Sequence, residues 1–144
     1  MAVDMSRFVA RFLEEAREHL TLLNEALLLL ALNPADQETV DALFRSAHTI
    51  TGSAGMLKLK PIAQTAHHLE EVLASLREGR IHYSPSLAEL LSRCAALLLL
   101  QLNGADHGMA VESDATLCQA LASAAIGEGG AQGSAETPEI MAIS

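Results

Sequence analysis

Apolar residues recur at every third or fourth position through most of this chain, which is the period of a helix that buries one face. The first such segment runs from about Asp4 to Leu32 and carries charged residues opposite its apolar stripe. The residue before a proline is driven out of the helical region, so this helix is expected to end at Asn33-Pro34. Its expected buried stripe consists of Phe8, Phe12, Ala16, Leu20, Leu23, Leu27 and Leu30.

Two further helices are expected in the middle of the chain. Asp36 is a suitable N-cap for a helix that continues to about Leu57. The next helix has Pro61 in its first turn and Gly79 just past its last, an asymmetry that is typical of helices. The expected core stripes are Leu43, Phe44, Ala47, Ile50, Ala54 and Leu57 in the former, and Ile62, Ala66, Leu69, Leu73 and Leu76 in the latter.

The remaining sequence predicts two more helices and then a change of composition. Ser84-Pro85 is an N-cap followed by proline at the first helical position, and Asn103-Gly104 is the expected C-cap of that helix. A shorter helix is expected over about 113–126, which closes a domain of residues 1–126. The segment 127–144 is rich in glycine and has no helical period, so it is interpreted as a flexible linker or tail.

Composition favours an all-α fold, an antiparallel four-helix bundle with an additional C-terminal helix. Hydrophobic residues make up 50% of the 144 residues and aromatic residues only 3%. Leu and Ala supply most of the apolar side chains, whereas strands prefer β-branched and aromatic residues. Short connections between amphipathic helices then predict an antiparallel bundle.

Charge and cysteine usage exclude several classes of protein. The formal net charge is -9 and the cations are scattered, which argues against a nucleic-acid binder. No uninterrupted apolar run approaches the roughly 18–20 residues of a membrane span, and the N-terminus has no signal-peptide pattern. Cys94 and Cys118 lack ligand spacing and are interpreted as inert buried thiols. A cytoplasmic domain without membrane insertion is therefore expected.

The stretch LFRSAHTITGSAGML, residues 43–57, contains the most informative histidine. On a helical wheel His48 lies at the edge of the apolar stripe, in line with Asp41, Arg45, Gly52 and Gly55. Glycine inside a helix costs about 1 kcal/mol against alanine, so two of them so close need a reason. They leave open helix surface beyond the imidazole, which suits a histidine that another protein must reach.

A neutral imidazole is a good nucleophile toward a phosphoryl group when one of its nitrogens is held as N–H. Glu70 on the following helix is the natural carboxylate to orient His48, because the two helices are joined by a short turn. His67, one turn before Glu70, is a supporting candidate. The chain has no GxxxxGK[ST] loop or other nucleotide motif, so the phosphoryl donor must be bound by a second protein.

The segment AHTITGSAGML resembles the signature of histidine phosphotransfer (HPt) domains, and the chain is most similar to the N-terminal phosphotransfer domain of CheA-type chemotaxis histidine kinases. The opening MAVDMSRFVARFLEEAREHL, FRSAHTI, AHHLEEVL and LCQAL match that domain in order and spacing. The resemblance implies that His48 accepts phosphate from the kinase's ATP-binding domain and passes it to an aspartate of a CheY- or CheB-like receiver. It also implies that His67 and Glu70 are supporting residues and that Gly52 permits close approach of the partner.

The same resemblance implies a domain that is monomeric and has no cofactor of its own. ATP and magnesium would be used by the kinase domain of the parent protein. The domain alone is then a phosphoacceptor and carrier rather than an autonomous enzyme.

One position departs from the family pattern. The family usually has lysine three residues after the phosphorylated histidine, and this chain has Thr51. A lysine there would place a cation near the phosphate, worth about 1 kcal/mol at a wet surface. Lys58 and Lys60, beyond the expected helix end, are candidates to compensate for part of that charge.

Three alternatives stay open at this point. His48, His67, His68, Glu70 and Glu71 provide ligand types for a metal site between helices, although the paired Glu-x-x-His pattern of di-metal bundles is missing. The chain is alternatively an inactive HPt-like docking module that lost activity through Thr51. It is alternatively a stand-alone phosphorelay protein rather than part of a kinase.

Overall fold

The computed structural model describes residues 5–127, which form five helices and no strand. These are α1 (Met5–Leu32), α2 (Gln37–Met56), α3 (Lys60–Arg77), α4 (Pro85–Asp106) and α5 (Ala115–Ala125). The prediction of an all-α bundle of four helices with an additional C-terminal helix is confirmed. The linker predicted at 127–144 lies outside the described residues from 128 onward, and the domain boundary at 126 stays a prediction.

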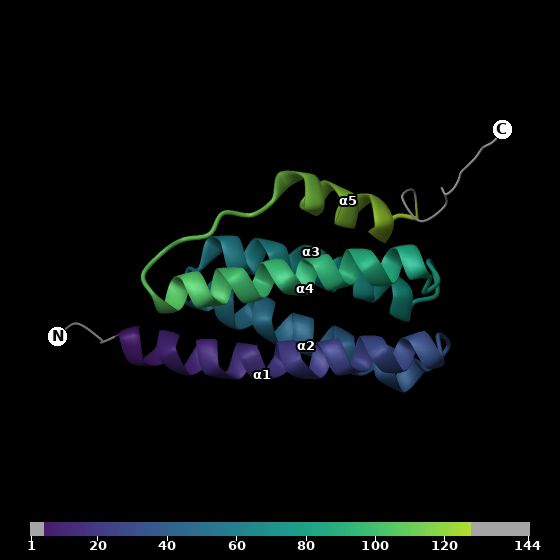
Figure 1. Cartoon of the computed structure of the whole chain (residues 1–144), viewed down its shortest axis with the longest axis horizontal. Helices are drawn as coiled ribbons and strands as arrows, with labels where there is room; N and C mark the ends of the chain where they lie inside the picture. The colour runs from purple at the N-terminus through teal and green to yellow at the C-terminus, as the bar shows by residue number, and fades with distance from the viewer. Residues whose placement is uncertain (1–4, 128–144) are drawn as a thin grey trace.

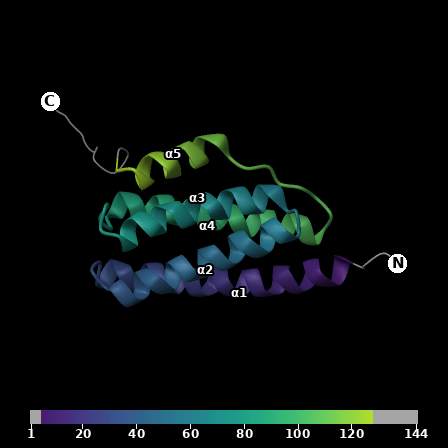
Figure 2. The ribbon, with the colours of Figure 1, turned by 180° about the vertical axis from the view of Figure 1, so that it is seen from behind.

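The first four helices run up and down in sequence order and close a bundle (Figure 1). α2 packs most extensively against α3, while α1 contacts both α2 and α4. α5 lies across α3 and α4, on the side of the bundle away from α1 and α2, and the view from behind shows the same arrangement (Figure 2). The α2–α3 pair therefore keeps an outer face that α5 does not cover.

The core is built almost entirely from leucine, alanine and a few β-branched residues, and every helix contributes to it. Phe8 differs from the sequence prediction, because the residue is 55% exposed. α1 has 28 residues and α4 has 22, so the first turns of α1 extend past the end of the bundle (Figure 1). The apolar stripe of α1 therefore becomes buried only from Phe12 onward.

Side chains cap the starts of α2, α4 and α5, the first two at the residues that the sequence predicts. The Asp36 carboxylate accepts hydrogen bonds from the backbone N–H of Glu38 and from the hydroxyl of Thr39. The Ser84 hydroxyl accepts one from the N–H of Leu87, and Asp114 plays the same part for α5. These contacts satisfy backbone donors that a helix start leaves without partners.

The predicted end of α4 at Asn103-Gly104 is wrong. The helix continues to Asp106, and the residue in left-handed conformation is Gly108, at φ +73°. Gly104 serves a different purpose: a Cβ there would lie 2.7 Å from the carbonyl oxygen of Met109 and 2.8 Å from Val111 Cγ2. The glycine lets the connection to α5 pass directly over the last turn of α4.

The turn between α2 and α3 sets the register of the two helices that carry the candidate site. The N–H of Leu59 donates to the carbonyl of Ala54 at 2.9 Å, and the N–H of Lys58 donates to that of Gly55 at 3.1 Å. This is a Schellman motif, whose left-handed position is most often glycine. Here it is Lys58, at φ 62°. A lysine therefore adopts a conformation that L-residues other than glycine rarely occupy.

Of the helices described, α4 is the one whose length and composition would suffice to cross a membrane. Polar residues interrupt its apolar sequence, among them Ser92, Arg93 and Gln101. Within the bundle 39% of its apolar window is buried, and the core helix of a bundle passes the same test. The finding is therefore weak evidence for a membrane span.

Candidate functional site

His48 and Glu70 meet on the outer face of the α2–α3 pair. The distance between His48 Nδ1 and Glu70 Oε2 is 2.6 Å. The histidine side chain is 68% exposed and the glutamate side chain only 17% exposed. The carboxylate thus lies sheltered between the helices and holds one edge of an imidazole whose remainder faces solvent.

The packing of α2 and α3 fixes this pair. Ala47 next to His48 and Leu69 next to Glu70 are both fully buried, so each functional side chain starts at the rim of the core. An ionised carboxylate only accepts hydrogen bonds, so the contact places the imidazole proton on Nδ1. The lone pair of Nε2 is then free for reaction at the exposed edge.

Two residues that the sequence analysis did not assign to the site complete its surroundings. The Phe44 ring is stacked on the imidazole of His48, with centroids 5.9 Å apart and planes 11° from parallel. The Arg77 guanidinium carbon lies 3.9 Å from the centroid of the Phe44 ring. Phe44 was expected in the core stripe, and its position four residues before His48 is the signal that points to a stack.

Thr51 lies one turn after Ala47, and its hydroxyl donates to the Ala47 carbonyl at 2.9 Å. The single hydrogen of this hydroxyl is therefore engaged with the helix backbone rather than directed at His48. Lys58 and Lys60, which the sequence offered as substitute cations, are both exposed at the α2–α3 turn. Their compensating role stays a prediction.

Gly52 and Gly55 are exposed on the same face, beyond His48. A Cβ built on either glycine would meet nothing within 4 Å. Packing inside the chain therefore does not require glycine at these two positions. The two residues leave a strip of bare helix surface beside the imidazole, as the sequence pattern predicted.

His67 has Glu71 rather than His48 as its polar partner. Its Nε2 lies 3.5 Å from Glu71 Oε2 on its own helix, and its side chain is 57% exposed. His68 Nδ1 approaches the same carboxylate at 3.6 Å, which is an ion-pair distance beyond hydrogen-bond length. His67, His68 and Glu71 thus form a cluster of their own contacts on α3. The supporting role of His67 stays a prediction.

The described residues fit neither of two further kinds of site, a metal site and a reactive thiol. Within residues 5–127, no three His, Cys, Asp or Glu side chains lie where they would jointly hold a metal ion. Cys94 and Cys118 are free and buried. Burial, with a further contribution from Cys118, raises the pKa of the Cys94 thiol to about 12, and burial also raises the pKa of Cys118. Both thiols are therefore protonated at neutral pH.

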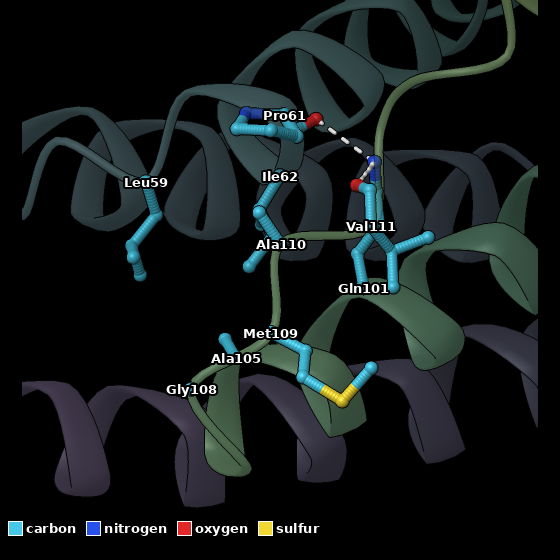
Figure 3. Close-up of a pocket in the computed structure, with 9 residues that line it drawn as sticks. All are labelled: Leu59, Pro61, Ile62, Gln101, Ala105, Gly108, Met109, Ala110 and Val111. Atoms are coloured by element: carbon cyan, nitrogen blue, oxygen red, sulfur yellow. Dashed lines mark hydrogen bonds between the residues drawn. The ribbon is translucent and has the colours of Figure 1, made fainter.

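A pocket of about 240 Å³ lies away from the His48 face, where the start of α3 meets the end of α4 and the connection to α5 (Figure 3). Its walls are mostly apolar, with Ile62, Met109 and Val111 among them. The Gln101 side chain crosses this region and donates from Nε2 to the carbonyls of Pro61 and Val111 at 3.2 and 3.3 Å. The pocket contains none of the residues that the sequence assigned to a site.

Comparison with known proteins identifies the class to which this fold and site belong. Residues 7–124 match the Hpt domain family, and the chain belongs to that family. It is similar to the chemotaxis protein CheA of Listeria monocytogenes serovar 1/2a, with 34% identity over 97 residues. These residues are 67% of this chain and 16% of that protein, so the chain spans a small part of the relatives it matches.

Solved structures agree with this assignment. The chain is similar to the CheA phosphotransferase domain from Thermotoga maritima, with 27% identity and a TM-score of 0.68 over 72% of this chain and 99% of that one. It also shares the fold of a histidine phosphotransfer domain of CheA, with 24% identity and a TM-score of 0.76 over 83% of this chain and 92% of that one. The resemblance noted from the sequence is thus confirmed at the level of family and fold.

Proposed function

We propose that His48 accepts a phosphoryl group from the ATP-binding domain of a chemotaxis-type histidine kinase and passes it to an aspartate of a response regulator. The observation that carries this proposal is the 2.6 Å contact between His48 Nδ1 and Glu70 on an open helix face. It leaves Nε2 unprotonated and exposed, which is the state that a nucleophilic imidazole needs.

In the first step Nε2 of His48 attacks the γ-phosphorus of ATP held by the kinase domain. The N–P bond forms as the bond to the ADP oxygen breaks, and ADP leaves with the electron pair. The ring becomes cationic because Nδ1 keeps its proton. The carboxylate of Glu70 stabilises that charge while it develops, an electrostatic contribution that costs no rearrangement during the reaction.

In the second step an aspartate carboxylate of the receiver attacks the same phosphorus. The P–O bond forms, the N–P bond breaks, and the imidazole returns to its neutral state with the proton still on Nδ1, where it is hydrogen-bonded to Glu70. The domain is thereby regenerated and acts as a carrier. ATP and magnesium belong to the kinase domain, and no cofactor is needed in this chain.

Both partners need to approach His48 closely, and the bare surface at Gly52 and Gly55 supports this. A receiver of the CheY or CheB type presents its aspartate from within a folded domain, so bulky side chains beside the histidine would obstruct it. The 144-residue chain is proposed to work as a cytoplasmic monomer in these encounters. His67 is proposed only as a rim residue of the same contact surface.

The test is phosphate incorporation from ATP labelled at the γ-position, with a CheA-type kinase core supplied as a separate protein. His48→Gln is the matched variant, since it keeps a polar side chain of similar reach and removes the nucleophile. We expect acid-labile, base-stable label in the natural chain and none in the variant. Phosphate should be attached to Nε2, which phosphorus NMR distinguishes from attachment to Nδ1.

Addition of a CheY-like receiver to the labelled chain should then discharge it. Label on Nδ1 would contradict the part assigned to Glu70. No label on a chain that keeps its helical circular dichroism would instead support the inactive docking module. Label that is formed but not discharged by any CheY- or CheB-like receiver would contradict the second step.

A further inference from the structure

The contact with Glu70 alone leaves His48 free to move in one important way. A single hydrogen bond at Nδ1 fixes one edge of the imidazole, but the ring can still tilt about the line that joins Nδ1 to the carboxylate. The histidine side chain is 68% exposed, so most of its surroundings offer no resistance. An attacking nitrogen needs a fixed direction, and the hydrogen bond does not supply it by itself.

We propose that Phe44 is a positioning residue that fixes the plane of the His48 imidazole, and that Arg77 holds Phe44 in place. This inference rests on the proposed phosphotransfer at His48. The two rings lie 11° from parallel with their centroids 5.9 Å apart, an offset stack of the kind that aromatic rings prefer. The edge of the Phe44 ring thereby lies against one face of the imidazole and restricts tilting toward Phe44.

Phe44 is itself held from two sides. Its ring is partly buried and packs against the core of the bundle. The guanidinium of Arg77 lies over the ring, 3.9 Å from the centroid, which is a cation–π geometry. The backbone carbonyl of Arg77 also accepts a hydrogen bond from Gln37 Nε2 at 3.0 Å. The last turn of α3 is thus tied to the first turn of α2, and Phe44 lies between that tie and His48.

Side chains from both helices consequently hold the imidazole. α3 supplies the carboxylate of Glu70 at one edge of the ring, and α2 supplies the Phe44 ring on one face. With the edge and the plane both set, Nε2 keeps one direction relative to the bare strip at Gly52. Freezing this tilt before the encounter spares the reaction the entropy of doing so during it.

The experiment compares Phe44→Leu, which keeps an apolar side chain but has no flat face, with Phe44→Tyr, which keeps the ring. Each is phosphorylated by the kinase core and, separately, by phosphoramidate, a small phosphodonor that needs no protein partner. We expect Phe44→Leu to lower kcat with the kinase core, and the rate with phosphoramidate, about fivefold, with KM changed less than about twofold. Phe44→Tyr should restore most of the loss.

Arg77→Gln keeps the backbone bond to Gln37 and removes the cation from the ring, so we expect a smaller loss of about twofold. Arg93→Gln on the exposed side of α4 is the control for removal of an arginine. Rates in Phe44→Leu equal to those of the natural chain, or an effect on KM alone, would overturn the proposal. Phe44 would then be a packing or docking residue.

A direct readout does not depend on activity or on the stability of any variant. In the natural chain, proton NMR should show the Hε1 or Hδ2 resonance of His48 shifted upfield by the Phe44 ring, with nuclear Overhauser contacts between the two rings. Absence of both would refute the stack. If the kinase core fails to label the chain while phosphoramidate succeeds, the proposed function fails and the Phe44 comparison still stands.

Discussion

The face of the bundle that carries His48 and the pocket beside Gln101 have opposite properties. The first has a candidate nucleophile that is 68% exposed, a sheltered carboxylate and a stacked ring. The second encloses about 240 Å³ between apolar walls, and no titratable side chain lines it (Figure 3).

The difference teaches what kind of substrate each region suits. Small ligands need a concave site because the protein must surround them. A phosphoryl group that arrives on one folded domain and leaves on another needs a nucleophile that projects from an open surface. The expected consequences of mutation differ accordingly. Substitutions at the His48 face should lower the rate of phosphoryl transfer, whereas substitutions at the end of α4 should lower the free energy of unfolding.

The largest effect is expected from Glu70→Gln, which removes the charge and keeps the shape of the side chain. We expect the rate of phosphorylation by a kinase core to fall on the order of a hundredfold, because the cationic ring loses its stabilising carboxylate. The free energy of unfolding should change by less than about 1 kcal/mol.

Glu71→Gln is the control for this substitution. Glu71 lies next in the chain and approaches His67 and His68 rather than His48. A comparable loss of rate in both variants would show that general acidity of the face, rather than the contact with His48, is responsible.

At the other region, Gly104→Ala should lower the free energy of unfolding by about 1–3 kcal/mol, measured by urea denaturation. The new Cβ would lie 2.7 Å from the backbone oxygen of Met109, which cannot move aside as a flexible side chain can. The phosphorylation rate of the folded protein should be unchanged. Gly55→Ala, with open space around it, should instead stabilise the chain by about 1 kcal/mol. Equal stability changes in the two variants would contradict the close approach at Gly104.

Thr51→Lys is expected to raise the rate of phosphorylation about fivefold, because a cation would then face the incoming phosphate. The gain should shrink at high ionic strength, since exposed charges are screened. Thr51→Gln has similar bulk and no charge, and it should not reproduce the gain. If both substitutions act alike, the inward hydrogen bond from Thr51 to Ala47 rather than the charge would be the cause.

The smallest effect concerns the turn that sets the register of α2 and α3. Lys58→Gly should raise the free energy of unfolding by about 0.5–1 kcal/mol, because glycine tolerates the positive φ at that position. Lys60→Gly, in the first turn of α3, should lower it by a similar amount. Thermal unfolding of the two variants measures both signs. A loss of stability in Lys58→Gly would mean that the lysine side chain contributes more than its backbone costs.

Much of this fold could be predicted from the sequence because its signals are local. The apolar stripe of α3 is buried at every expected position, and the caps at Asp36 and Ser84 form as expected. The end of α4 was misjudged because Asn103-Gly104 is a common C-cap pattern. The reason for Gly104 lies in the connection that crosses it, and such a contact leaves no local pattern.

In the candidate site, too, some features could be predicted from local sequence signals and others could not. Helical periodicity placed His48 at the rim of the core, and the short turn after α2 pointed to Glu70 as its neighbour. Periodicity also placed Phe44 at the core edge without showing that its ring would lie parallel to the imidazole. Arg77 lies on another helix, and His67 points to Glu71, so side-chain directions between helices decide both cases. No local pattern in a single sequence predicts these side-chain directions.

The inward hydroxyl of Thr51 has a thermodynamic consequence for the phosphorylated domain. Without the charge that a lysine would supply, the phosphoryl group on His48 is less well stabilised beside the Glu70 carboxylate. A phosphohistidine of this kind has a higher group-transfer potential. A deficit of about 1 kcal/mol displaces the equilibrium with an aspartyl acceptor about fivefold toward the acceptor. On the proposed function, the domain would accept phosphate from the kinase more slowly and transfer it to the receiver aspartate more completely.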